Sequence, residues 1–165
     1  MRLLLPFLLA GGLFAQTAPN TVPVTATVNL PTNWAGVFAT YGTKAGGSFS
    51  YATLLSGKGQ IYSFTTYDES VVKSTTGGYV VQSSPRTGFA TLFRNIGPVY
   101  LFVFGDAGTS TTGTNTGGAF GPGGMCLVRL GKTDWTIQGA VRYIKNTLPS
   151  LPDQTIYELG FGHIW

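Results

Sequence analysis

Near the C-terminus, two stretches alternate between a face of mainly large apolar residues and a face of mainly small or polar ones. In residues 155–165 the large set is Tyr157, Leu159, Phe161, His163 and Trp165. In residues 135–145 it is Trp135, Ile137, Val141 and Tyr143. A period of two is the signature of β-strands whose two faces meet different environments. These stretches therefore predict a β-hairpin. Any fold of this chain must remove the large apolar face of this hairpin from water.

The register of this hairpin follows if the linker 146–154 brings Lys145 opposite Thr155. The expected facing pairs are then Tyr143/Tyr157, Arg142/Glu158 and Trp135/Trp165. Aromatic pairs would stand near both ends of the apolar face, and a pair of opposite charges would lie on the other face.

An apolar band bounded by aromatic residues suits a strand that crosses a bilayer. A membrane barrel carries an apolar band about 25 Å tall on its outside, with aromatic girdles at both interfaces. The candidate girdle residues are Trp135, Tyr143, Tyr157 and Trp165. The sequence thus predicts an all-β, antiparallel up-and-down transmembrane β-barrel. A soluble β-sandwich is the alternative.

The final strand also resembles the closing strand of small bacterial outer-membrane β-barrel proteins. Tyr157, Leu159, Phe161 and Trp165 match that pattern, which ends on an aromatic residue, and His163 departs from it. The resemblance implies an outer membrane of the Gram-negative type, contact with its lipid, and recognition of this strand by the barrel assembly machinery. It specifies no activity.

The composition agrees with a membrane environment. Aromatic residues make up 13% of the chain and charged residues only 10%, whereas soluble domains average about 25% charged residues. The net charge of +4 comes from scattered residues, which is not the basic patch of a nucleic-acid-binding protein. Cys126 is the only cysteine, so an internal disulfide is excluded.

The N-terminal region predicts export. Arg2 precedes a short apolar core, and residues 1–15 are interpreted as a signal peptide. Residues 16–33, rich in Pro and Thr, are interpreted as a periplasmic extension, with a strand at 24–30 as the alternative. Residues 34–165 form the expected barrel domain.

Turn residues divide the barrel region into eight predicted strands, or ten if residues 24–30 and 79–82 pair as well. The connections at 56–59, 95–98 and 131–134 are short, and three of the other four are longer. This contrast predicts short periplasmic turns, which carry Lys58 and Lys132, and longer outer loops. Residues 106–118 consist mostly of Thr, Gly, Ser and Asn and predict a flexible outer loop. Strands are expected to begin after Pro85 and Pro122, or to bulge there.

The sequence offers no grouping of residues for catalysis. His163 is the only histidine and falls on the apolar face, away from any evident nucleophile. One His and one distant Cys cannot form a metal site, and no cofactor is expected.

We therefore expect a non-enzymatic barrel with a structural or surface-interaction role. Its Thr/Gly/Ser-rich loops would face outward, and its lumen would be filled by side chains, including the pair Arg142 and Glu158. The alternatives are a secreted sandwich that acts as a binding module and a lipid-modifying barrel enzyme. The sequence indicates no extracellular ligand.

Overall fold

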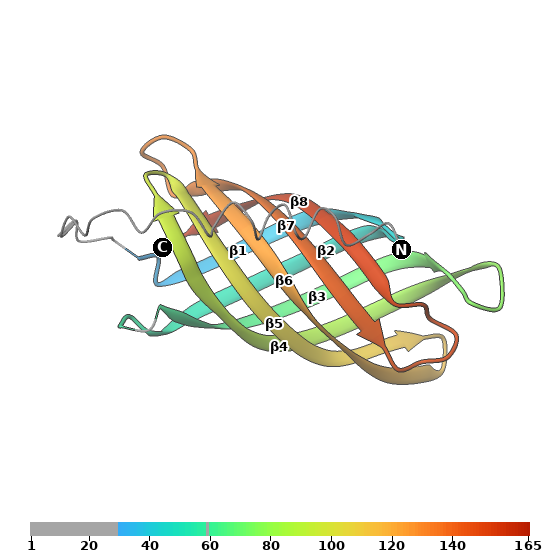
Figure 1. Ribbon diagram of the computed structural model, residues 1–165. Coiled ribbons are helices and arrows are strands. Elements are labelled where there is room, and N and C mark those ends of the chain that lie inside the picture. The colour runs from blue at the N-terminus through green and yellow to red at the C-terminus, as the bar shows by residue number, and fades with distance from the viewer. Residues whose placement is uncertain (1–29, 59) are drawn as a thin grey trace, which may run out of the picture.

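The protein folds into one closed antiparallel sheet of eight strands. The structure, a computed structural model, describes residues 30–58 and 60–165. The strands are β1 (Asn33–Gly42), β2 (Lys44–Ser56), β3 (Ile61–Lys73), β4 (Tyr79–Ile96), β5 (Val99–Thr112), β6 (Asn115–Arg129), β7 (Trp135–Asn146) and β8 (Gln154–Ile164). Each strand pairs with its sequence neighbours, and β1 pairs with β8 to close the barrel (Figure 1).

The predicted strand number and the up-and-down antiparallel topology are confirmed. The predicted alternative of a sandwich is wrong, because all eight strands belong to a single sheet that has no free edge. Residues 79–82 lie within β4 and do not form a separate strand. The predicted signal peptide and almost all of residues 16–33 lie outside the described residues, and Asn33 already belongs to β1.

The strands run further than the sequence predicts. Residues 106–118, expected to be a flexible loop, instead form the ends of β5 and β6, joined by a tight turn at Gly113 and Thr114. Gly113 has φ 57°, the left-handed conformation that glycine adopts without strain. The composition argument failed because these strand ends are held by backbone pairing, and the side chains that they turn inward, such as Asp106 and Ser110, are polar.

Pro85 and Pro122 lie inside strands, contrary to expectation. Pro85 pairs with Tyr67 within β3–β4, and Pro122 pairs with Gly105 within β5–β6. On the other edge of each strand, the pairing is interrupted at the proline. Toward β5, β4 pairs through Ser83 and next through Arg86, so Pro85 lies in a gap. Toward β7, β6 pairs through Phe120 and next through Gly123, so Pro122 lies in a gap as well. A missing N–H is tolerated at such interruptions.

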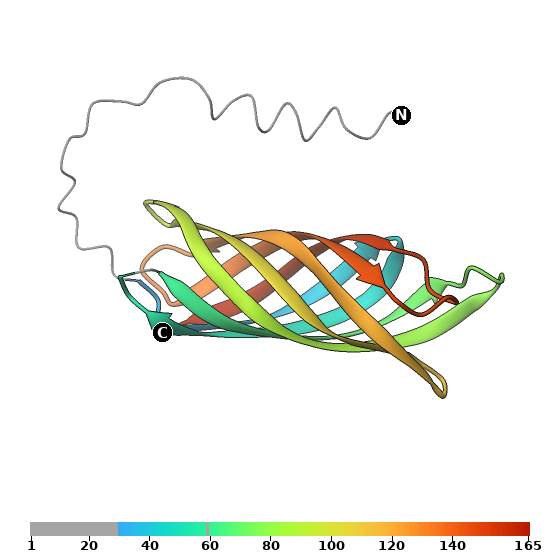
Figure 2. The ribbon, with the colours of Figure 1, turned by 60° about the horizontal axis from the view of Figure 1, so that its bottom comes forward.

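The expected contrast between short turns and long loops is also wrong. The connections 57–60, 97–98 and 130–134 lie at the same end as the C-terminus, which we call the terminal end. At the other end, the far end, the connections are residue 43, residues 74–78, 113–114 and 147–153. The asymmetry resides in the strands, because the β3–β4 and β5–β6 hairpins project at the far end (Figure 2).

The register of the last hairpin differs from the predicted one by two residues. Trp135 lies opposite His163 and Val141 opposite Tyr157, while Arg142 faces Ile156. The faces were assigned correctly, because a shift of two residues leaves every side chain on its own side of the sheet. The linker sets the register: an Asp153 carboxylate oxygen accepts a 3.1 Å hydrogen bond from the Asn146 N–H, and the Asn146 amide donates to the Pro152 carbonyl.

Candidate functional site

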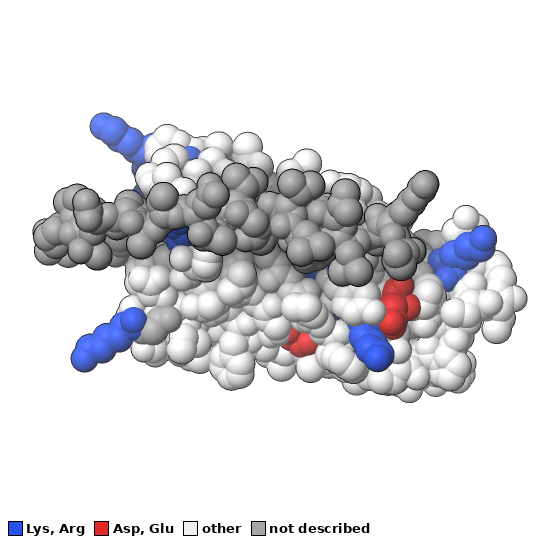
Figure 3. All heavy atoms as spheres, viewed as in Figure 1, with Lys and Arg blue, Asp and Glu red and all other residues white. Residues whose placement is uncertain are grey.

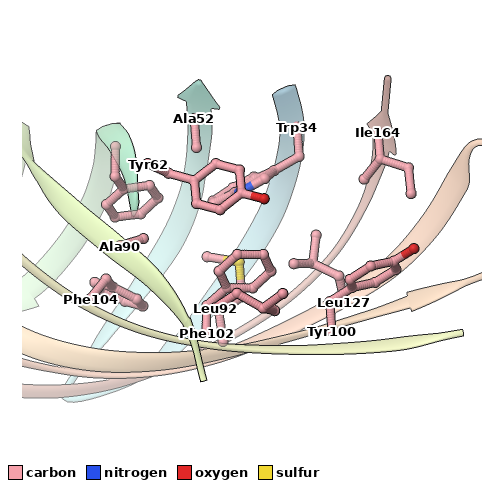
Figure 4. Packing of buried hydrophobic residues seen from close by; sticks show 12 residues of the cluster. Trp34, Ala52, Tyr62, Ala90, Leu92, Tyr100, Phe102, Phe104, Leu127 and Ile164 are labelled. Atoms are coloured by element: carbon pink, nitrogen blue, oxygen red, sulfur yellow. The ribbon is translucent and has the colours of Figure 1, made fainter. Parts of the chain in front are cut away.

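Near the terminal end, an aromatic plug fills the inside of the barrel. We give this name to the cluster of Trp34, Ala52, Tyr62, Phe64, Ala90, Leu92, Tyr100, Phe102, Phe104, Met125, Leu127 and Ile164, all of them buried (Figure 4). Its rings lie close together, with centroids 4.8 Å apart for Phe64 and Phe104 and 5.3 Å apart for Tyr62 and Phe102. At these distances the rings are in contact, so the plug obstructs this part of the lumen.

Six charged side chains lie directly beyond the plug and form what we call the charged belt. Its members come from six different strands and are Lys44, Asp68, Arg86, Asp106, Arg142 and Glu158. They alternate in sign along one chain of ion pairs. The nitrogen–oxygen distances are 2.5 Å for Lys44–Asp68, 2.7 Å for Arg86–Asp68, 3.4 Å for Arg86–Asp106, 2.5 Å for Arg142–Asp106 and 3.3 Å for Arg142–Glu158.

The belt is electrically balanced and shielded from solvent. Three cations oppose three anions, and the side-chain exposure of each member is at most 1%. A buried charge without a partner is costly, whereas a hydrogen-bonded pair recovers much of that cost. Hydroxyl groups supply further partners: Ser48 donates to Glu158 at 2.7 Å, and Ser84 accepts from Arg86 at 2.8 Å.

Arg142 joins the belt to the plug. Its guanidinium lies 4.8 Å from the ring centroid of Phe104 and 5.6 Å from that of Phe64, within the range of a cation–π contact. The same guanidinium donates to Asp106, Glu158 and the hydroxyl of Thr66. Arg142 is therefore the most connected member of the belt.

The two charged residues singled out from the sequence, Arg142 and Glu158, are both buried in the lumen and form an ion pair. They do so diagonally, since Glu158 lies opposite Ala140. Sequence reasoning missed the other four members of the belt. Asp68 had a detectable signal, because it continues the alternating series Phe64, Thr66, Asp68 within β3. Asp106 was hidden by the assignment of its segment to a loop.

The far end of the lumen holds amide and hydroxyl groups beside a small buried apolar cluster of Ala119, Ile144 and Ile156. Gln154 donates to Gln82 at 2.7 Å, Gln82 donates to Ser110 at 2.9 Å, and Ser110 donates to Asn146 at 2.9 Å. Above them, the β7–β8 connection, residues 147–153, crosses to the β3–β4 turn, where Thr75 N–H donates to the Ser150 carbonyl at 3.1 Å. Polar groups and this apolar cluster thus share the lumen between the belt and the connection.

The outer face of the barrel is apolar. Large hydrophobic side chains project from all eight strands, and in the view of Figure 3 most of the visible Lys and Arg atoms lie toward the two ends. Among the described residues, no helix is long and apolar enough to cross a membrane.

All four candidate girdle residues lie on this outer face, with exposures of 43–50%. Trp135 and Trp165 are at the terminal end and Tyr143 and Tyr157 toward the far end. The two tryptophans do not pair directly: His163 lies between them, with its ring centroid 5.0 Å from Trp135 and 5.6 Å from Trp165. Toward the far end, the ring of Tyr157 stacks on that of Tyr41, with the two ring centroids 5.6 Å apart.

His163 therefore contacts aromatic rings, and no hydrogen bond to a nucleophile or carboxylate is found for it within the described chain. Residues 30–58 and 60–165 contain no group of three or more His, Cys, Asp or Glu side chains suited to a metal ion. Cys126 is a free thiol on β6. The chemistry that this arrangement offers is ion pairing inside the barrel and apolar contact outside it.

Comparison with known proteins supports the architecture. No protein-family model matches the sequence, and no curated protein matches it either. Among solved structures, the fold is similar to that of the Yersinia pestis outer membrane protein Ail, determined in a phospholipid bilayer nanodisc. The TM-score is 0.54 at 14% sequence identity, over 82% of this chain and 99% of the other. The two chains therefore share the closed antiparallel barrel fold.

Proposed function

We propose that this protein is a non-enzymatic β-barrel of a Gram-negative-type outer membrane, with a closed lumen and a surface-interaction role at its far end. One observation carries the proposal: the barrel has charged residues inside and large apolar residues outside. Soluble proteins rarely expose extended apolar surface. A wall of this kind is stable when acyl chains surround it.

The height of the apolar wall fits a bilayer. Trp135 and Tyr143 are eight residues apart on β7. At about 3.3 Å per residue and a strand tilt of about 40°, they are separated by about 20 Å along the barrel axis. An outer-membrane barrel has an apolar band of about 25 Å. Trp135, Tyr143, Tyr157 and Trp165 are therefore our proposed interfacial girdles, and outer-membrane lipid is the proposed partner of the wall.

The proposed orientation places the terminal end in the periplasm. In barrels of this class, periplasmic turns are short and extracellular segments are longer. Here the projecting β3–β4 and β5–β6 hairpins supply the longer segments, while Lys58 and Lys132 belong to connections at the terminal end. The outward row of β8, made of Tyr157, Leu159, Phe161 and Trp165, is the proposed signal for the barrel assembly machinery.

A non-enzymatic role is supported by the use of the polar groups inside the barrel. Each charge of the belt is paired with an opposite charge of the belt, and the aromatic plug obstructs the lumen beside it. The remaining surface suited to an interaction is the far end. The lipid-modifying alternative lacks support, because His163 lies among tryptophan rings at the terminal end.

Two measurements test the proposal. Unboiled protein from the membrane fraction should migrate differently from boiled protein on denaturing gels, as folded barrels do.

The second measurement tests the orientation. Cys126 is first replaced by Ala, and a single cysteine is then introduced as Thr114→Cys or Lys132→Cys. On intact cells, an impermeant maleimide should label the Thr114→Cys variant but not the Lys132→Cys variant. Labelling of the Lys132→Cys variant alone would invert the orientation, and absence of the protein from the membrane fraction would refute the proposal.

A further inference from the structure

At the far end, the two projecting hairpins separate and leave a cleft. The last pair between β4 and β5 is Ser83 with Thr111, although β4 continues outward to Tyr79 and β5 to Thr112. Figure 1 shows the β3–β4 and β5–β6 hairpins diverging beyond this point. The space between them is a cleft of about 390 Å³, lined by Ser74, Thr76, Thr112, Asn115, Ser150 and Val81 among others.

Hydrogen bonds between the connections hold one wall of the cleft in place. Ser74 Oγ is 2.9 Å from Thr76 Oγ1 and donates to the Ser150 carbonyl at 3.1 Å. Thr75 adds a bond from its hydroxyl to the Pro149 carbonyl at 2.7 Å. These bonds tie the β3–β4 turn to the β7–β8 connection, so hydroxyl groups on this wall are already positioned before a ligand arrives.

The side chains that line the cleft indicate the chemical class of ligand that it can bind. Its polar side chains are hydroxyls and one amide, and none of the described residues that line it is charged. Hydroxyl and amide groups both donate and accept hydrogen bonds, which suits a ligand that carries several hydroxyl groups of its own. An anionic ligand would need a cation in the lining, which is missing from this set.

An exposed aromatic ring lies next to the cleft. Tyr79 is 76% exposed, the largest value among the exposed large hydrophobic side chains. It is two residues from Val81 on β4 and so projects from the same face of that strand. Tyr79 is also adjacent in the chain to Val80, another residue that lines the cleft, so its exposed ring is available for contact with the C–H groups of a ligand bound there.

We infer that the cleft binds one neutral pyranose unit of a glycan, with hydroxyl groups of the sugar on Thr76, Asn115 and their neighbours and its apolar face on Tyr79. The volume of about 390 Å³ lies in the lower part of the range for small-molecule sites, about 300–1,000 Å³. It suits one or two sugar rings. The inference rests on the proposed surface-interaction role and deepens it, since an outward-facing far end would meet the glycans outside the cell.

The test is saturation-transfer NMR on the purified barrel in lipid nanodiscs, with the methyl glycosides of glucose, galactose, mannose and N-acetylglucosamine as probes. At least one probe should receive saturation. Tyr79→Ala and Asn115→Ala should each weaken its binding at least tenfold, while Tyr79→Phe should keep it because the ring remains. Tyr67→Ala, an exposed tyrosine lower on β3, is the matched control and should bind as the unchanged protein does.

Gel migration of each variant without boiling confirms that the barrel still folds. The inference is overturned if none of the four glycosides binds, or if Tyr79→Ala and Asn115→Ala bind as well as Tyr67→Ala does. Binding of an extended peptide in place of sugars, through the β4 edge above Ser83, would also overturn it. Because the barrel is purified, this result is independent of the labelling that tests membrane orientation.

Discussion

Arg142→Met is the most informative perturbation of the charged belt. It removes the ion pairs to Asp106 and Glu158 and the cation–π contacts to the plug, and it retains an unbranched apolar side chain of similar length. Asp106 keeps Arg86 at 3.4 Å, whereas Glu158 keeps only the hydroxyl of Ser48. The chief consequence is therefore an uncompensated carboxylate at position 158.

The expected magnitude follows from burial. Removal of one partner from a buried ion pair costs about 3–5 kcal/mol, because the other charge stays buried. In the double variant Arg142→Met with Glu158→Gln, the belt is again neutral, with two cations and two anions. We expect the double variant to recover about 2–3 kcal/mol of the loss, which is the upper part of the range of about 0.5–3 kcal/mol for coupling between residues in direct contact.

The assay is the free energy of unfolding in lipid vesicles, from reversible urea titrations of both single variants and the double variant. The matched control is Arg129→Met, which breaks the solvent-exposed ion pair with Asp134 at the terminal end. This control should cost less than about 1 kcal/mol. Strictly additive losses within the belt, or a cost for Arg142→Met no larger than that of the control, would refute the reasoning.

Three further predictions concern other parts of the barrel. Gly160→Ala should lower the free energy of unfolding by about 1–3 kcal/mol, since its new Cβ would collide with the Val37 carbonyl; Gly139→Ala, whose Cβ would lie 3.8 Å from the nearest atom, should be nearly neutral in the same titration. The purified barrel should show no large steady conductance in planar bilayers, because the plug fills the lumen, and porin-like openings would contradict this. Hydrogen bonds from the Tyr143 hydroxyl and the Asn146 N–H lower the pKa of Asp153 below its ordinary value, so the stabilisation that they provide is lost as the pH falls through that lowered pKa. Hydrogen exchange of the amides in residues 147–153, corrected for intrinsic rates, should accelerate as the pH falls through this pKa. Asp153→Asn should remove this pH dependence of the exchange.

The period of two in the sequence determined which side of the wall each residue occupies. Arg142 and Glu158 were assigned to the lumen and Trp135, Tyr143, Tyr157 and Trp165 to the outer face from alternation alone, and the structure places them there. The strand number followed from the same periodicity and from the turn residues. These features are local, because a strand exposes alternate residues whatever its partner is.

Only the tertiary structure decided which residues meet. Registers that differ by two residues give the same faces, so periodicity cannot choose between Tyr157 and Thr155 as the partner of Tyr143. The ends of β5 and β6 were equally hidden, because the inward-facing side chains of β5 there, Asp106, Ser110 and Thr112, are polar and leave no apolar pattern. The charged belt brings together residues from six strands, and only the pairing and curvature of these strands place Lys44 in the same network as Glu158.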